Sequence, residues 1–171
     1  MKRYLYVALS TLLIHCSALA ADQVVYGQLS SLYNQFPTGT QPASFERADA
    51  LVGIEHPAPD KVLIKESGTY FVMAAGQAGV DASANTEGGV VDLWLMKNGQ
   101  NVPNSGVRQS LENLQSTSVV VSQAILPMKE GDTISIGYSA TKPLHGLIAI
   151  KGVANEPAIP SIIISIYKIG S

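Results

Sequence analysis

The chain has 171 residues, the length of a single domain, and a formal net charge of −2. Only 14% of its residues are charged, against about 25% in typical domains, and its lysines and arginines form no cluster. This pattern excludes a basic nucleic-acid-binding surface. It favours a protein that is closely packed or that covers much of its surface by association.

The first 20 residues are organised like a Sec-type signal peptide. Lys2 and Arg3 form a basic start, residues 4–14 are mostly apolar, and residues 18–20 read Ala-Leu-Ala, a small-x-small cleavage site. The apolar run is too short to span a bilayer, so no membrane-spanning segment is expected. The alternative interpretation is a buried N-terminal strand or helix.

Cleavage after Ala20 leaves a mature domain of residues 21–171, secreted or held at the cell surface or in the periplasm. Cys16 is the only cysteine, and lipid attachment there is an alternative, although His15 stands where a lipoprotein signal needs a small residue. The mature domain would hold no disulfide. Its stability must then come from its core and from a partner subunit.

Short apolar or alternating segments, separated by turn signals, follow one another along the mature chain. The expected strands lie at residues 24–33, one or two within 44–54, then 61–65, 69–75, 90–97, 100–102, 118–126, 133–138, 144–153 and 162–169. The expected loops and turns lie at residues 34–43, 56–60, 76–89 and 103–117, the last with one possible helical turn at 109–115. Nine or ten short strands without a clear helix indicate a sandwich or a closed barrel.

Two of these strands lack a polar face. Residues 70–75 contain no charge and are apolar throughout, and residues 162–169 are interrupted only by Ser165 and Lys168. A strand with one solvated face would alternate polar and apolar residues, as residues 133–138 do. We therefore predict that residues 68–75 form a central strand, covered by the second sheet on one face and by another chain on the other.

Three motifs in chain order resemble the globular domain of the C1q and tumour-necrosis-factor (TNF)-like superfamily. Residues 68–72 read Gly-Thr-Tyr-Phe-Val, residues 93–99 end in Lys-Asn-Gly, and residues 126–134 read Leu-Pro-Met-Lys-Glu-Gly-Asp-Thr-Ile. The Asn98-Gly99 pair also predicts a tight hairpin turn, independently of the resemblance. The resemblance covers residues 23–169 and implies an all-β, ten-strand jelly-roll sandwich of two antiparallel sheets, in a bacterial secreted protein.

The resemblance also implies a homotrimer, in which one sheet of each subunit packs around a threefold axis. The candidate interface residues lie on the apolar strands, and either they or the opposite faces of the same strands would meet the axis. The candidates are Tyr70, Val72, Tyr138, Ile162, Ile164 and Ile166.

Catalytic and metal signals are weak. Ser139, His145 and Asp132 make no convincing triad, because no nucleophile-elbow motif is present, and we expect His56 and His145 to be exposed turn residues. Asp132 is expected to cap its own turn. No cofactor is expected, although calcium is conceivable in the loop around residues 88–89, with Asp81 and Asp92 as weak candidates beside Asn85 and Glu87.

Trp94 lies within an expected strand, where a core or interface position is the more common case and a sugar-stacking surface the alternative. Two functions remain open. The first is a non-enzymatic binding module that recognises a glycan or a cell-surface protein through loops 76–89 and 103–117. The second is a structural surface or matrix component. A hydrolase is a distant third.

Overall fold

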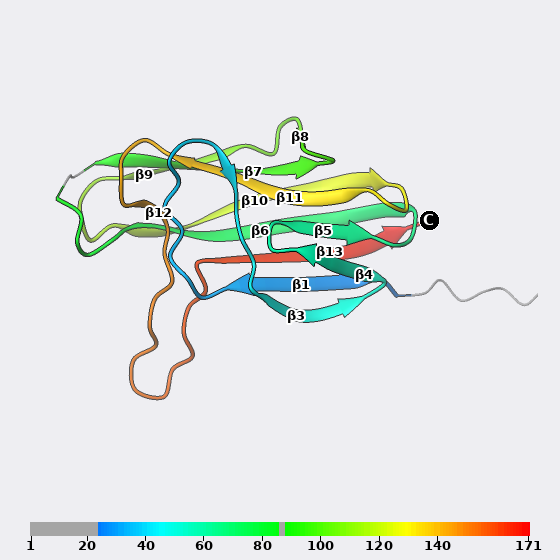
Figure 1. Cartoon of the computed structure of the whole chain (residues 1–171), viewed down its shortest axis with the longest axis horizontal. Coiled ribbons are helices and arrows are strands. Elements are labelled where there is room, and N and C mark those ends of the chain that lie inside the picture. Colours follow the sequence, from blue (N-terminus) through cyan, green and yellow to red (C-terminus); the bar gives the residue numbers. More distant parts are fainter. Residues whose placement is uncertain (1–23, 86–87) are drawn as a thin grey trace, which may run out of the picture.

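The computed structural model describes residues 24–85 and 88–171, and over these residues it contains thirteen β-strands and no helix. The strands form two antiparallel sheets whose long strands follow the long axis of the molecule (Figure 1). The expected signal peptide, including Cys16, lies outside the described residues.

Sheet A has the strand order β10-β6-β13-β1-β3, and the short strand β12 pairs with the far end of β6. All of its strand pairs are antiparallel. Its strands are β1 (Tyr26–Ser31), β3 (Arg47–Val52), β6 (Gly68–Val80), β10 (Thr117–Met128), β12 (His145–Leu147) and β13 (Ile162–Gly170).

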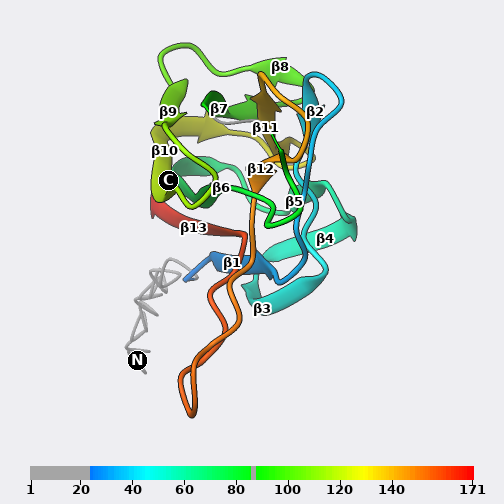
Figure 2. The same ribbon diagram turned by 90° about the vertical axis from the view of Figure 1, so that its left-hand side faces the viewer.

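Sheet B has the strand order β4-β5-β11-β7-β8, with β2 on the free edge of β11 and β9 on that of β7. Its strands are β2 (Gln41–Pro42), β4 (Ile54–Ala58), β5 (Lys61–Ile64), β7 (Gly89–Lys97), β8 (Gln100–Asn101), β9 (Val107–Leu111) and β11 (Thr133–Ala140). Figure 2, which looks along the strands, shows the two sheets as the layers of a sandwich.

The predicted central strand is confirmed as β6, which lies between β10 and β13. Tyr70, Val72 and Ala74 point into the sandwich and are fully buried, whereas Phe71 and Met73 between them are half-buried on the other side. The side chains of a strand alternate between its two faces, so a run that is apolar throughout needs two apolar neighbours. Sheet B is the apolar neighbour of the face that carries Tyr70, Val72 and Ala74.

The Asn98-Gly99 hairpin is confirmed between β7 and β8. Asn98 and Gly99 have φ angles of 51° and 76°, and Lys97 and Gln100 are Cα partners across the turn. Two successive positive φ angles match the twist of the strands they join, and asparagine and glycine adopt them at the lowest cost. This turn was predictable because its geometry is set locally.

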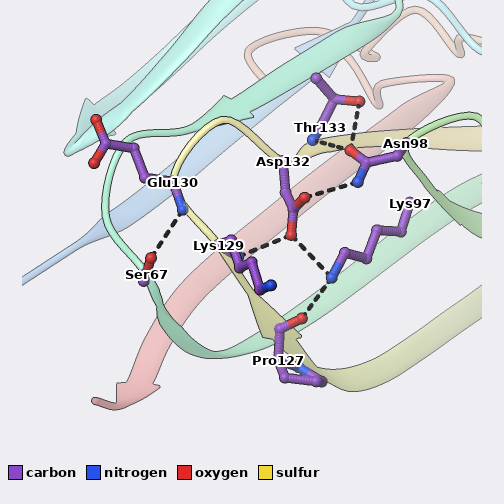
Figure 3. A network of polar contacts seen from close by, with 8 residues as sticks. All are labelled: Ser67, Lys97, Asn98, Pro127, Lys129, Glu130, Asp132 and Thr133. Carbon is purple, nitrogen blue, oxygen red and sulfur yellow. Dashed lines mark hydrogen bonds and ion pairs between the residues drawn. The ribbon is translucent and has the colours of Figure 1, made fainter.

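Asp132 caps its turn as predicted, and it also ties that turn to the β7–β8 hairpin (Figure 3). Its Oδ2 accepts a hydrogen bond from the backbone N–H of Lys129 at 2.8 Å and lies 2.9 Å from Lys97 Nζ. Its Oδ1 accepts from Asn98 Nδ2 at 2.7 Å, and Asn98 Oδ1 in turn accepts from the backbone N–H of Thr133 at 2.7 Å.

The turn that precedes the first motif lies at the same end of the sandwich. Ser67, in the turn that opens β6, accepts a hydrogen bond from the backbone N–H of Glu130 at 3.0 Å through its Oγ (Figure 3). The second and third motifs and the turn just before the first are thus joined at one end of the sandwich, although Ser67 and Glu130 are 63 residues apart.

The expected loop at residues 76–89 is wrong for its first part, because β6 continues to Val80. The glycines of this segment leave room for side chains from another part of the chain and do not mark a turn. A Cβ on Gly79 would overlap the side chain of Ile148, and one on Gly76 would lie 2.8 Å from Leu147. Distant residues pack onto the strand at these glycines, a contact that local sequence does not reveal.

Three other expectations also need correction. Residues 109–115 do not form a helical turn: β9 occupies Val107–Leu111 and pairs with β7, so loop 103–117 is shorter than expected. The strand expected at 144–153 is only β12; Ile148 still donates to Gln77 O of β6 at 2.9 Å, and the chain then leaves the sheet until Ser161, whose O accepts from Gln77 N at 2.8 Å. Residues 54–58 form β4, an edge strand whose pairing is irregular between Glu55 and Ala58, where Pro57 has no N–H to donate.

Candidate functional site

The outward side of sheet A is the most unusual surface of the described residues. Along its strands, the side chains that alternate with the core residues point away from sheet B and are mostly apolar. We call this surface the open face and define it by Tyr26, Phe71, Met73, Ala75, Val119, Val121, Gln123, Ile125, Ile163, Tyr167 and Ile169.

Strand register arranges these side chains in rows across the sheet. In the first row, Cα partners bring together Ile125, Phe71, Tyr167 and Tyr26. The next row is more polar and contains Gln123, Met73, Ser165 and Gln28. The third contains Val121, Ala75, Ile163 and Ser30. No side chain in these rows on β10, β6, β13 and β1 carries a charge, and the edge strand β3 continues the third row from Ser30 to Arg47, which pairs with Asp49.

Several large apolar side chains of the open face are exposed to solvent. Ile125 is 63% exposed, Val119 59% and Tyr167 47%. Monomeric proteins rarely leave a contiguous apolar patch of this kind in water, and such patches mark sites of interaction. The open face is therefore the candidate functional site.

All six interface candidates lie in the interior of the sandwich, each at most 1% exposed. Tyr138 belongs to sheet B, and the others, Tyr70, Val72, Ile162, Ile164 and Ile166, face it from sheet A. They are core residues of the subunit, so their side chains are not part of its surface. The opposite faces of β6 and β13, which the sequence left as the alternative, are the exposed ones.

Sequence reasoning missed the contribution of β10. Val119, Val121 and Ile125 lie on the open face, while Val120 and Ser122 between them are buried. The signal was present, because residues 119–121 are three consecutive valines and are apolar on both faces, as in β6. The criterion used for residues 70–75, a run that is apolar on both faces, also identifies residues 119–121.

The open face is bordered by a long excursion between β12 and β13, which we call the projecting hairpin (residues 148–161). Ile150 and Ile159 pair across it through N–H···O bonds of 3.0 and 2.8 Å, and it extends well beyond both sheets (Figures 1 and 2). A hollow of about 370 Å³ separates Pro157 and Pro160 from Ser30 and Ile163 of sheet A. The projecting hairpin therefore forms one margin of the open face.

The histidines do not lie where they were expected. His145 is fully buried in β12, with its ring against Gly89 and its Nδ1 2.9 Å from Pro143 O. The expectation of an exposed residue is wrong there because Gly89, having no side chain, leaves room for the imidazole. His56 is half-buried within β4 and is not in a turn.

Ser139, His145 and Asp132 are not assembled. Asp132 precedes β11 and Ser139 lies near its other end, roughly 20 Å away at the usual rise of a strand. Asp132 is also committed to Lys129, Asn98 and Lys97. These residues offer no nucleophile activated by a base.

The two weak calcium candidates bind protein groups. Asp81 Oδ1 accepts the backbone N–H of Ser83 at 2.9 Å, which together with the Ser83 hydroxyl lowers the pKa of this carboxyl. Asp92 is held by Arg108 through two hydrogen bonds of 2.7 and 2.8 Å. Glu87 lies outside the described residues. Within residues 24–85 and 88–171, no group of three or more acidic, histidine or cysteine side chains is arranged to hold a metal ion.

Trp94 is not a core residue. It lies half-buried on the outward face of sheet B, opposite Gly137 of β11. The described part of the chain also contains no helix that is long and apolar enough to cross a membrane.

No family model matches the chain, and no curated protein matches it in sequence. Among solved structures, it is similar to the globular domain of the zebrafish complement 1qA protein, with a TM-score of 0.55 and 14% identity over 86% of this chain and 98% of that one. It is also similar to murine APRIL, with a TM-score of 0.54 and 10% identity over 86% of this chain and 100% of that one. At such identities the likeness concerns the fold alone.

Proposed function

We propose, on the premise that the chain has a C1q/TNF-like jelly-roll fold, that it is an exported, non-enzymatic recognition protein. Three copies assemble through the open face of sheet A. The surfaces that remain exposed then recognise a glycan or a surface protein.

The observation that carries this proposal is the open face itself. It is mostly apolar, its rows are uncharged on β10, β6, β13 and β1, and it is built on hydrogen-bonded strands, so a small local movement cannot bury its side chains. Burying such a surface is favourable by roughly 25 cal/mol for each Å² of apolar area. The low charge of the whole chain fits a protein that covers part of its surface by association.

A second copy of the same chain suits this surface because the surface is mostly apolar and every copy carries the same apolar surface. Closed symmetric assemblies are the usual state of such chains. The threefold arrangement follows from the family resemblance, in which one sheet of each subunit faces the axis. Sheet B and its connecting loops then point outward and stay accessible, where residues on a rigid scaffold suit recognition.

Three tyrosines allow a matched test. Tyr167→Asp places a charge on the open face at a residue that is 47% exposed, so we expect a folded subunit that does not assemble. Tyr70→Asp places the same charge in the core, where the phenol is buried and donates to Glu66 O at 2.7 Å, and we expect it to abolish folding.

Tyr33→Asp is the control, because Tyr33 is 68% exposed and lies outside the rows of the open face. Light scattering measures the mass of each purified variant, and far-ultraviolet circular dichroism reports its folding. The proposal predicts a monomer only for Tyr167→Asp among the folded variants. A Tyr167→Asp protein with the mass of the unmodified assembly would refute the assignment of the interface.

A further inference from the structure

The outward face of sheet B carries a feature that the assembly does not use. In β7, Asp92, Trp94 and Met96 point outward, and Trp94 has Gly137 of β11 as its Cα partner. A Cβ added to Gly137 would overlap Cε2 and Nε1 of the indole. The ring therefore packs directly on the backbone of the neighbouring strand.

The orientation of the indole is set by its one polar atom. Trp94 Nε1 donates a hydrogen bond to Asn101 Oδ1 at 2.8 Å, so the only polar group of the indole already has a partner. The remaining ring surface is hydrocarbon and partly exposed. Asn101 still offers its two amide N–H groups at the edge of the ring.

A hollow of about 330 Å³ lies beside this ring, lined by Asp92, Leu93, Trp94, Gly106, Val107 and Arg108. Gly106 lines this hollow, and a Cβ at this position would meet no atom within 4 Å. The backbone there does not have a positive φ angle, so nothing in the local conformation requires glycine.

Arg108 and Asp92 form the polar wall of the hollow. They are Cα partners on β9 and β7, and the Arg108 Nε and Nη2 donate to the two carboxylate oxygens of Asp92 at 2.7 and 2.8 Å. The guanidinium keeps three further N–H donors, and the carboxylate keeps unused lone pairs. The Arg108 side chain is 68% exposed, so these groups are available.

We propose that this hollow is a saccharide-binding site. An apolar ring face set beside a fixed fork of donors and acceptors matches a pyranose, which presents C–H groups on one face and vicinal hydroxyls at its rim. The two charges neutralise each other, so the site has no net charge with which to attract a phosphate or an acidic peptide. The acidic net charge of the chain disfavours a nucleic acid that would stack on the same ring.

This inference rests on the proposed recognition function, and it replaces recognition through loops with a site on a sheet. Since the hollow faces away from sheet A, assembly through the open face leaves it accessible in each subunit. Three sites pointing outward would bind a dense glycan surface with greater avidity than one site binds a free sugar.

The chain contains a single tryptophan, so its fluorescence reports on this hollow alone. The first measurement applies the unmodified protein to an array of immobilised neutral glycans. The second titrates free methyl glycosides of the sugars bound there and follows the tryptophan emission. The proposal predicts binding on the array and a saturable change in emission.

Gly106→Leu adds a side chain at the lining of the hollow, and Gly39→Leu is its control, because a Cβ on Gly39 also meets no atom within 4 Å but lies elsewhere on the surface. We expect at least a tenfold loss of affinity for Gly106→Leu and none for Gly39→Leu. Arg108→Ala, at an exposed side chain, provides a second variant with the same expected loss.

Two results would overturn the site: the absence of any glycan bound by the unmodified protein, or unchanged affinity in both Gly106→Leu and Arg108→Ala. Light scattering on the same samples keeps the two proposals distinguishable. An assembled protein that binds no glycan contradicts the saccharide site alone, whereas a monomer that binds glycans contradicts the assembly alone.

Discussion

At the scale of single residues, Asp132 shows most clearly how the turns are held together. The hydrogen bond from Asn98, the backbone N–H of Lys129 and the ammonium group of Lys97 lower the pKa of its carboxyl to about 2 from an ordinary 3.8. A carboxyl whose pKa is lower in the folded state stabilises the fold above its ordinary pKa. That contribution is lost as the pH falls from about 4 through about 2.

Asp132→Asn should therefore lower the free energy of unfolding at neutral pH by about 1–2 kcal/mol, a range reduced for screening near the surface. Because asparagine carries no titrating proton, the variant should also lose part of the decline in stability between about pH 4 and 2. Urea unfolding across this pH range, at one fixed protein concentration, measures both effects.

Glu130→Gln is the control for that experiment, since only the backbone N–H of Glu130 takes part in the network (Figure 3). It should match the unmodified protein throughout. If Asp132→Asn retained the full acid dependence, the stabilising role of this carboxylate would have to be abandoned.

At the scale of strands, β10 separates the core from the open face within two neighbouring residues. Val120 is 5% exposed and faces sheet B, whereas Val121 is 41% exposed and lies on the open face. The same truncation at each position therefore probes the subunit core and the proposed interface separately.

In the Tyr167→Asp background, where we expect a monomer, Val120→Ala should lower the free energy of unfolding by about 2 kcal/mol through lost burial and a residual cavity. Val121→Ala should change it by less than about 0.5 kcal/mol. In the otherwise unmodified chain, Val121→Ala should instead raise the concentration needed for assembly by roughly tenfold. Equal effects of both truncations on the monomer would mean that the open face belongs to the subunit core.

The strands also show what local sequence can predict. The Asn98-Gly99 hairpin was predictable because its backbone angles depend on two residues. The extension of β6 to Val80 was not, because its glycines are explained only by the packing of Ile148 and Leu147 from another part of the chain. Similarly, β9 looked polar in sequence, and it is a strand because it completes the edge of sheet B beside β7.

At the scale of the whole molecule, the class of the fold could be predicted from the sequence. The jelly-roll sandwich of C1q and TNF type expected from three motifs is confirmed, and two of the motifs meet at one end of it with the turn that precedes the first. The choice between the two faces of the central strands was not predictable. Both faces of β6 are apolar, and only the position of sheet B shows that Tyr70 and Val72 are interior.

The proposed saccharide site was even harder to predict from the sequence. Trp94 was noted, but its neighbours in the hollow come from three separate segments: β7, Gly106 with β9, and Asn101 of β8. Their meeting depends on strand register, which a hydrophobic pattern does not specify at a sheet edge.

The central claim is that the open face is covered by sister subunits, and the mass in solution of a protein of residues 21–171 tests it most directly. Sedimentation equilibrium at micromolar concentration should give three times the mass of one chain. A stable species with the mass of a single chain under the same conditions would contradict the account.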